Sequence, residues 1–300
     1  MTVGGLRQAG AGSLVTAWFI GPRTPPLDDK PSNIPLAALG AALLWFGWFG
    51  FNGGSALHAN SLAVVAVLNT QVAVAASCLT WTLLSTPWTR RQHLQHGPSV
   101  VDILNGAVAG LAGITPAAGF VTTSGALILG CLIGLVTYHL TLHFREWTGI
   151  DDALDVTVIH GVSGAIGALM IGFLGSSAVN MKGKDGLLYG GDGNLLSEQA
   201  FAVVVATAWS IIATFGILVI LQALLGGIRH RDEDEHHGLD TLDHDIAAYS
   251  LSSSPVNSPA TRVGPSDARE PLPRQRPRYG SVDLMVDGGE MPATAECGRC

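Results

Sequence analysis

The feature that most constrains this chain is a series of six long apolar runs separated by short polar segments. A helix that crosses a bilayer needs about 20 mostly apolar residues, at about 1.5 Å of rise each. The runs that reach this length lie at residues 35–56, 59–84, 99–119, 120–144, 151–174 and 197–226. Residues 8–20 read as the second half of a seventh helix. We therefore predict an all-α, polytopic membrane helix bundle of about seven helices, incomplete at its N-terminus.

The composition agrees with a membrane protein. Only 13% of the residues are charged and 48% are hydrophobic, whereas soluble domains carry about 25% charged residues. The net charge of -7 comes from acids in loops and after Gly227, so it implies no nucleic-acid partner. Cys297 and Cys300 form a single CxxC motif without a second pair of ligands. We expect no metal site, no cofactor and no enzymatic activity.

The chain divides by composition into three parts. Residues 1–226 are the predicted transmembrane domain, residues 227–250 a short tail segment, and residues 251–300 a Ser/Pro/Arg-rich tail that is too poor in apolar residues to form a core. Within the tail, Ser281 is a candidate phosphorylation site. The acidic run 232–235 precedes two histidines; it is either a metal site or a solvated charged face, and we favour the latter.

Basic residues alternate between the predicted loops, which sets the orientation. One side holds most of them, namely Arg23, Lys30, Arg90, Arg91, Arg145, Arg229 and Arg231, while the other side holds Arg7, Lys182 and Lys184. The more basic side of a membrane protein faces the cytoplasm. The sequence therefore predicts a cytoplasmic C-terminus and an outer glycine-rich loop at 175–196.

His160 is the one ionisable side chain in the twenty residues after Asp155. Ionisable groups at bilayer depth are rare, costly and by default functional. Because imidazole exchanges a proton and both donates and accepts hydrogen bonds near neutral pH, His160 is a candidate site for a small polar or protonated substrate. The alternative is a buried histidine that a neighbouring helix satisfies, and the local sequence leaves both open.

Glycines mark two further features. Gly106 and Gly110, four residues apart, predict close helix packing. The segment 50–55, GFNGGS, is expected to end or loosen its helix at membrane depth, which is tolerated only inside protein or beside a cavity. For Phe51 in this segment, ordinary core filling is the alternative to a role at a pore.

Two segments have a distinctive sequence, namely WFGWFGFNGGSALHAN at 45–60 and DDALDVTVIHGVSGAIGALMIGFL at 151–174. They resemble signature sequences of the ammonium transporter family, which includes methylammonium permeases and Rhesus proteins. GLAGITPAAGFV at 110–121 is similar to the family's eighth helix and the turn after it, and GLDTLDHDIAAY at 238–249 to its cytoplasmic tail motif. The similarity covers about residues 1–250 in one continuous order.

The resemblance implies a plasma-membrane trimer in which each subunit has its own hydrophobic pore for ammonium or ammonia. The family has eleven helices, the first ten forming two inverted repeats, and this chain matches the end of the fifth to the eleventh. The matching substrate-pathway positions are His160 in the pore histidine pair, Phe51 at the outer gate, Ser55 at the outer ammonium site, Trp48 near the pore wall and Val156 toward the inner end.

Other matching positions carry structural or regulatory roles. Asp151, Asp152 and Asp155 match acidic positions where the family's tenth helix begins, and Asp155 has helix capping as its simpler role. The tail motif keeps a set that contacts the neighbouring subunit in the family, namely Gly238, Leu239, Asp240, His244 and Tyr249. Asp245 and Ile246 depart from the Gly-Glu usual there.

A further departure concerns the first pore histidine. Counting back from Gly21, this histidine should fall at position 6, where the chain has Leu6. No counterpart of the family's first four helices precedes it. We therefore predict ammonium transport through a hydrophobic pore, with this chain a truncated form that we do not expect to conduct without the first four helices. The alternative is a non-conducting subunit that associates with full-length relatives.

Overall fold

The computed structural model describes residues 5–24, 33–86 and 99–246. These described residues belong to one compact unit. The predicted tail 251–300, with Ser281, and Tyr249 of the tail motif lie outside the described residues. Within the described residues the regular structure is helical, apart from one β-bridge between Val121 and Gly175. The predicted all-α fold is therefore confirmed.

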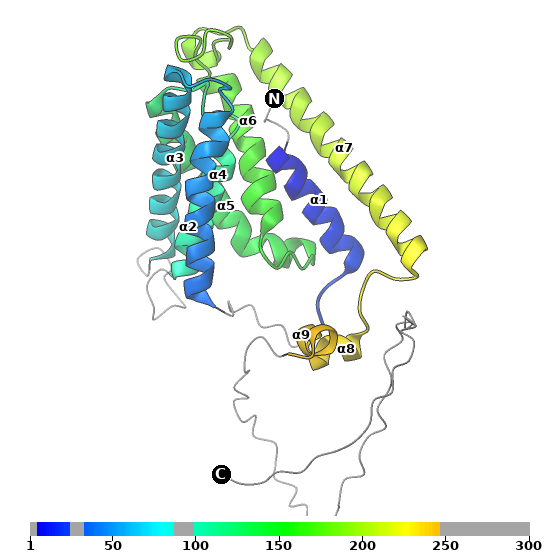
Figure 1. Ribbon diagram of the computed structural model, residues 1–300. Helices are drawn as coiled ribbons and strands as arrows, with labels where there is room; N and C mark the ends of the chain where they lie inside the picture. Colours follow the sequence, from blue (N-terminus) through cyan, green and yellow to red (C-terminus); the bar gives the residue numbers. More distant parts are fainter. Residues whose placement is uncertain (1–4, 25–32, 87–98, 247–300) are drawn as a thin grey trace, which may run out of the picture. The chain divides into compact units, whose positions relative to one another are not determined.

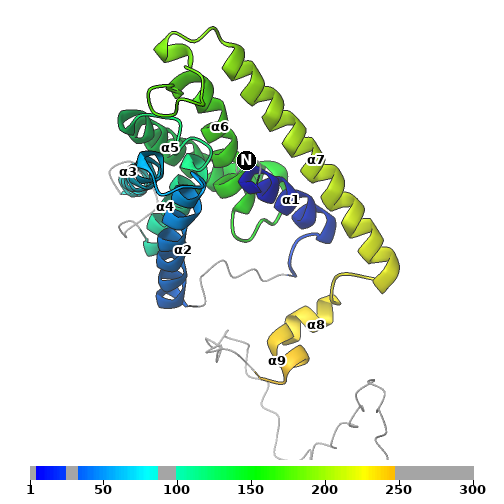
Figure 2. The ribbon, with the colours of Figure 1, turned by 45° about the horizontal axis from the view of Figure 1, so that its top comes forward.

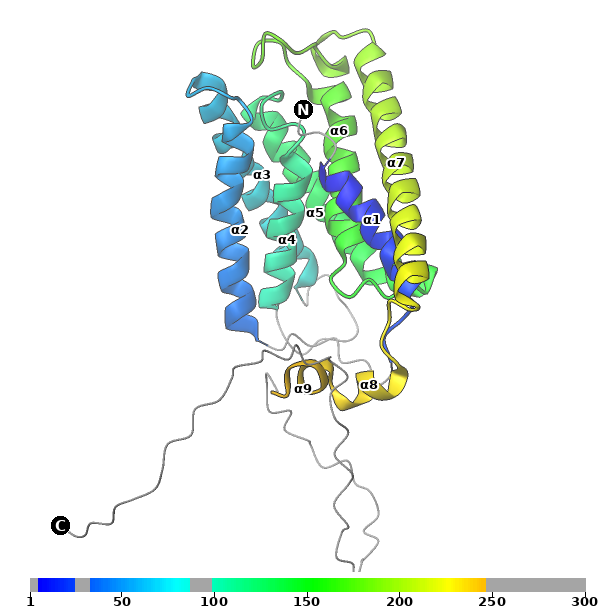
Figure 3. The ribbon, with the colours of Figure 1, turned by 45° about the vertical axis from the view of Figure 1, so that its right-hand side comes forward.

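The helices alternate in direction between two ends of the unit, with α1 lying between the bundle α2–α6 and the long α7 (Figures 1 and 3). Within the part of the chain that the structure describes, five segments are long and apolar enough to cross a membrane: α2, α3, α5, the continuous run of η1 and α6, and α7. The elements are α1 Gly5–Ile20, α2 Ile34–Gly54, α3 Ser61–Ser85, α4 Val100–Ile114, α5 Thr123–Thr148, η1 Thr157–Val162, α6 Ser163–Leu174, η2 Leu187–Tyr189, α7 Asn194–Leu225, α8 Asp232–His237 and α9 Leu239–His244.

Helix ends follow local sequence signals. A side chain before the helix accepts a hydrogen bond from the first turn at α2, α3, α4 and α5; the residues are Asn33, Asn60, Ser99 and Thr122. Such caps satisfy backbone N–H groups that have no partner inside the helix. At the other end, Gly149 and Gly226 take left-handed conformations that suit glycine.

Two spans are shorter than predicted. The run 99–119 is helical only to Ile114, because Pro116 has no N–H to continue the ladder; buried turns follow at 115–118. The run 151–174 becomes helical only near Thr157. The first six residues of the helical part, Thr157–Val162, form a π-helical turn. By contrast, the segment 50–54 is not loosened: α2 stays helical to Gly54 and ends there, as the glycines predicted.

Small residues bring α3, α4 and α5 into close contact. A Cβ on Gly110 would lie 2.9 Å from the Cα of Val74, and one on Gly106 would lie 2.8 Å from the ring of Trp81. Side-chain atoms do not approach this closely, so glycine is required at both positions. The predicted role of this glycine pair in helix packing is confirmed.

The outer helices show the opposite pattern. α2 buries only Asn52 and Gly53 along its length, and α7 buries only Leu195, Ser210 and Leu218. Figure 2 shows these two helices on opposite sides of the bundle. Apolar helices with so much exposed surface suit a lipid environment rather than water. The chain is an integral membrane protein.

Candidate functional site

One face of α2 carries three of the predicted pathway residues. Trp48, Phe51 and Ser55 are separated by three and four positions, which places them on the same side of a helix. The rings of Trp48 and Phe51 lie 5.9 Å apart, and the Phe51 side chain is 48% exposed. The Ser55 hydroxyl donates to the carbonyl of Phe51 at 2.7 Å. Phe51 is therefore not a core-filling residue within the described unit.

The Trp48 ring is oriented by a residue that the sequence did not single out. Its indole Nε1 donates to Thr115 Oγ1 at 2.8 Å, and that hydroxyl donates to the Leu111 carbonyl at 2.7 Å. Thr115 lies where Pro116 ends α4, so the same break that shortens the helix supplies the acceptor. The fold thus holds the indole plane in place from a second element.

His160 lies within the π-helical turn of η1 and faces the same tryptophan. The two rings lie 6.5 Å apart with an interplanar angle of 20°, a stacked arrangement. Nδ1 of His160 is buried and has no hydrogen-bond partner among the described residues. The alternative that a neighbouring helix satisfies this nitrogen is not what the structure shows. Trp48 therefore connects Phe51 and His160 in a row of three rings.

A groove of about 550 Å³ runs along α2 beside the rings of Trp48 and Phe51. Its wall is apolar, made of leucines, glycines and aromatic rings. The lining residues are Gly40, Leu43, Leu44, Gly47, Trp48 and Phe51. An unpaired charge in such a groove is poorly stabilised, whereas a cation near the ring faces is attracted.

The backbone of α1 touches η1 next to His160. A Cβ on Gly161 would lie 3.2 Å from the Cα of Gly10, so the two helices cross at a pair of glycines. Leu6 precedes Gly10 by one helical turn, on the same side of α1. Its side chain lies outside the described residues. The helix that carries position 6 is thus the one that crosses η1 beside His160.

The acidic residues before η1 have separate contacts. Asp152 Oδ2 accepts from the N–H of Thr157 at 2.7 Å and so satisfies one backbone N–H in the first turn of this span. Asp155 has a positive φ of 53° and forms the bend before the helix. Val156, the next residue, is half-buried, and its apolar side chain makes no capping hydrogen bond to η1.

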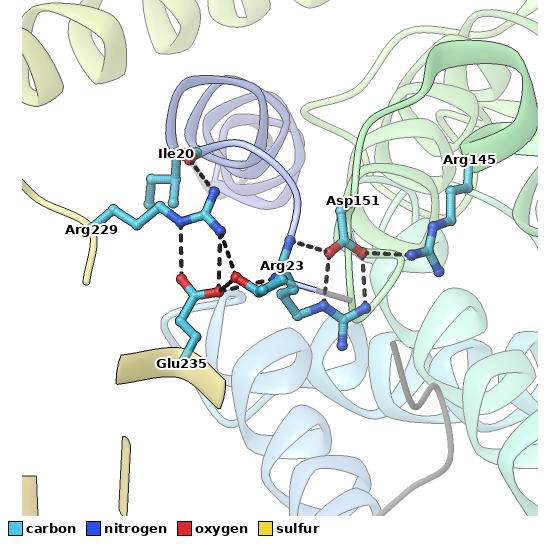
Figure 4. Close-up of polar contacts among 7 residues, drawn as sticks. Ile20, Arg23, Arg145, Asp151, Arg229 and Glu235 are labelled. Carbon is cyan, nitrogen blue, oxygen red and sulfur yellow. Dashed lines mark hydrogen bonds and ion pairs between the residues drawn. The ribbon is translucent and has the colours of Figure 1, made fainter. Parts of the chain in front are cut away.

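Asp151 joins two loops at the basic end (Figure 4). Arg23 donates to it from Nε and Nη2, each at 2.8 Å, and Arg145 Nη2 lies 3.4 Å away. The Asp151 side chain is only 3% exposed. Hydrogen bonds from Arg23 are the main reason that the pKa of Asp151 falls to about 2. This carboxylate therefore stays charged and holds α1 to the segment that leads into η1.

A second polar cluster holds α8 to the end of α1. Arg229 donates to both oxygens of Glu235, at 2.9 and 3.1 Å, and to the carbonyl of Ile20 at 3.2 Å (Figure 4). Thr24 donates to Glu235 Oε2 at 2.6 Å. The prediction of a solvated charged face at 232–235 is therefore wrong for Glu235. Nothing in the local sequence identifies Thr24, since its partner is 211 residues away.

The described part of the tail motif forms the short helix α9 after α8. Gly238 has a φ of 90° and separates α8 from α9, where Leu239, Asp240 and His244 lie. His230 Nε2, between α7 and α8, lies 3.7 Å from Asp243 of α9. The described part of the motif is thus positioned at the same end as Arg23, Arg145 and Arg229.

Comparisons with known proteins agree with this arrangement. Residues 7–249 match the family model described as Ammonium Transporter Family. Ammonium transporter 1 of Dictyostelium discoideum is 40% identical over 246 residues, covering 81% of this chain and 51% of the relative. Ammonium transporter Amt1 of Archaeoglobus fulgidus is 40% identical over 244 residues, covering 81% and 59%.

Solved structures give the same result. The crystal structure of Candida albicans Mep2 is similar with a TM-score of 0.68 and 30% sequence identity, covering 76% of this chain and 51% of that one. Saccharomyces cerevisiae Mep2 has a TM-score of 0.65 and 32% identity, covering 72% and 50%. The chain thus spans about half the length of the relatives that it matches.

Proposed function

Starting from the premise that this chain belongs to the ammonium transporter family, we propose that it forms one wall of a path by which ammonium or ammonia crosses a membrane. Its matching relatives are named as transporters and not as enzymes. The observation that carries the proposal is the row of Phe51, Trp48 and His160 beside an apolar groove.

The first part of the path recruits a cation. Phe51 presents an exposed ring, and the faces of aromatic rings attract ammonium-like cations by about 0.5–2 kcal/mol. Ser55 lies one turn further along α2 and offers hydroxyl lone pairs at the same end. These two residues, with Trp48, supply a site for ammonium at the mouth.

The second part of the path favours the neutral molecule. The groove is lined by apolar side chains, so a bare cation would lose its hydration without compensation once a further wall closes the groove. Ammonia can instead donate to or accept from an imidazole nitrogen, and Nδ1 of His160 has no partner within the described residues. Ammonium that gives its proton to solvent water at the open mouth near Trp48 leaves ammonia, which can then pass along His160. Val156 lies one turn closer to the basic end.

The proposed orientation places the basic end in the cytoplasm of a plasma-membrane protein. Arg23, Arg145 and Arg229 gather there around Asp151 and Glu235, and an excess of Lys and Arg marks the cytoplasmic side. The tail motif 238–249 then faces the cytoplasm. The exposed faces of α2 and α7 are available to other subunits of a homotrimer.

A second candidate function is that of a subunit that does not conduct by itself. It is favoured by the exposure of α2: the groove beside Trp48 is open, and the described residues do not close it into a pore. A full-length relative that packs on this face would complete the wall.

Growth of yeast without its own ammonium transporters, on low ammonium, separates the two functions. Residues 1–300 are expressed alone and together with a weakly active full-length relative, and membrane levels are matched. Growth with the chain alone that is lost in His160→Leu supports the path. His139→Leu, an exposed histidine of α5, is the matched control and leaves growth unchanged. Rescue only with the relative supports the second function, and no effect in either strain contradicts both.

A further inference from the structure

Thr24 lies at the contact between the end of α1 and α8, surrounded by charged groups. Its Oγ1 is 2.6 Å from Glu235 Oε2 and 3.3 Å from Asp232 Oδ1, and its backbone N–H donates to Glu235 Oε2 at 3.0 Å. Arg229 Nη2 approaches the hydroxyl at 3.4 Å. A single hydroxyl therefore lies between two carboxylates and one guanidinium.

The contact does not open with pH near neutrality. Hydrogen bonds from Arg229 and then from Thr24 lower the pKa of Glu235 to about 2, and Glu235 in turn raises the pKa of Arg229. Both partners therefore stay charged across the physiological range. An added negative charge at Thr24 would act on this contact under conditions where a change of pH does not.

We propose that Thr24 is a phosphorylation site and that its phosphate releases α8 from the end of α1. In the reaction, Thr24 Oγ1 attacks the terminal phosphorus of a nucleoside triphosphate. The new Oγ1–P bond replaces the bond to the nucleoside diphosphate, which leaves, and the hydroxyl proton passes to a base of the kinase. The proposal rests on the proposed function in one respect, because the basic end must face the cytoplasm, where nucleoside triphosphates are present.

The effect of the phosphate follows from its surroundings. It carries a charge of about -1.5 to -2, at a position that now touches the Glu235 carboxylate and lies close to Asp232. Both acids belong to α8, so repulsion between the phosphate and these carboxylates destabilises the contact of α8 with the end of α1. Arg229 then pairs with the phosphate in place of Glu235, while the guanidinium of Arg23 remains engaged by Asp151. The hydroxyl is half-buried, so phosphorylation captures moments when α8 has moved away.

Hydrogen exchange of the full chain in lipid nanodiscs tests the release of α8. In Thr24→Asp we expect the amides of residues 232–237 to exchange roughly tenfold faster or more, the change that about 1.4 kcal/mol produces. Thr24→Ser keeps the hydroxyl and leaves exchange unchanged. Thr148→Asp adds the same charge at the exposed end of α5 and serves as the control for charge alone. Equal exchange of α8 in Thr24→Asp and the unmodified chain overturns the proposal.

Peptide mapping tests the modification itself. Chymotrypsin cuts after Phe19 and Leu27, and the resulting peptide IGPRTPPL has Thr24 as its only hydroxyl. We expect a phosphorylated fraction of this peptide in protein purified with phosphatase inhibitors from the cells that naturally express it. Its complete absence overturns the proposal. Protease access to residues 251–300 in sealed vesicles tests the orientation separately, so failure of the proposed orientation is distinguishable from failure at Thr24.

Discussion

Trp48 and Trp81 are held by the same pair of hydrogen bonds in different surroundings. Each indole N–H donates to a threonine hydroxyl, Thr115 or Thr137, at 2.8 or 3.1 Å. Each hydroxyl donates in turn to a carbonyl four residues earlier in its own helix. Trp81 is 2% exposed and packs on Gly106, whereas Trp48 borders a groove and stacks on His160. The same local bonding thus stabilises a core in one place and orients a ring at a candidate path in the other.

The largest expected effect is that the two tryptophans differ in what their loss changes: Trp81 is needed for stability and Trp48 for transport. Trp81→Ala removes a fully packed ring and lowers the free energy of unfolding by about 3 kcal/mol. Trp48→Ala costs less because one side of its ring already faces the groove, but it abolishes any transport-dependent growth. Thermal unfolding in detergent and the yeast assay measure the two effects. Equal destabilisation by both substitutions contradicts the comparison.

Glycines offer the next test. A Cβ on Gly130 of α5 meets the backbone of Ala73, whereas nothing lies within 4 Å of a Cβ on Gly50 of α2. Gly130→Ala therefore forces α3 and α5 apart and costs about 1–3 kcal/mol. Gly50→Ala changes stability by less than about 1 kcal/mol, in the favourable direction that alanine has in a helix. The melting temperatures of the two variants measure this difference. A similar loss of stability in both argues against close packing at Gly130.

The threonines test the shared bonding directly. Thr137→Val leaves the buried Trp81 N–H without an acceptor, which costs about 1–2 kcal/mol. Thr115→Val frees an indole that borders the groove, so the loss of stability is smaller and the effect falls on the position of the Trp48 ring. We expect Thr115→Val to reduce ammonium-dependent growth at unchanged membrane levels. A variant that grows normally shows that the threonine does not position the ring.

The smallest effect belongs to the basic end. The pKa of Asp151 is lowered from its ordinary 3.8 to about 2, so the stability that it contributes is present above pH 4 and is lost as the pH falls toward 2. Solvent around Arg23 reduces this contribution to about 1 kcal/mol. Melting curves between pH 5 and pH 2 should show a steeper loss in the natural chain than in Asp151→Asn. Parallel curves show that this carboxylate does not stabilise the fold.

Apolar length and local spacing predicted most of the helices. The common face of Trp48, Phe51 and Ser55 was readable from their spacing, but the family resemblance alone singled these residues out. Contacts across long sequence separations were not predictable, because neither Arg23 with Asp151 nor Thr24 with Glu235 leaves a local signal. The end of α4 at Pro116 was readable in principle, since proline interrupts the helix ladder. We extended that span too far because its buried turns are as apolar as a helix.

The π-helical turn at Thr157–Val162 has a consequence for mutational scanning of this span. One additional residue in a turn shifts the register of all later side chains by roughly 100° relative to a continuous α-helix. Tolerance to substitution along residues 151–174 should therefore show a helical period before and after His160, with the two periodic patterns out of phase. Deletion of a single residue inside the turn should bring these patterns into phase and turn the imidazole away from Trp48, even though every side chain of the groove is retained.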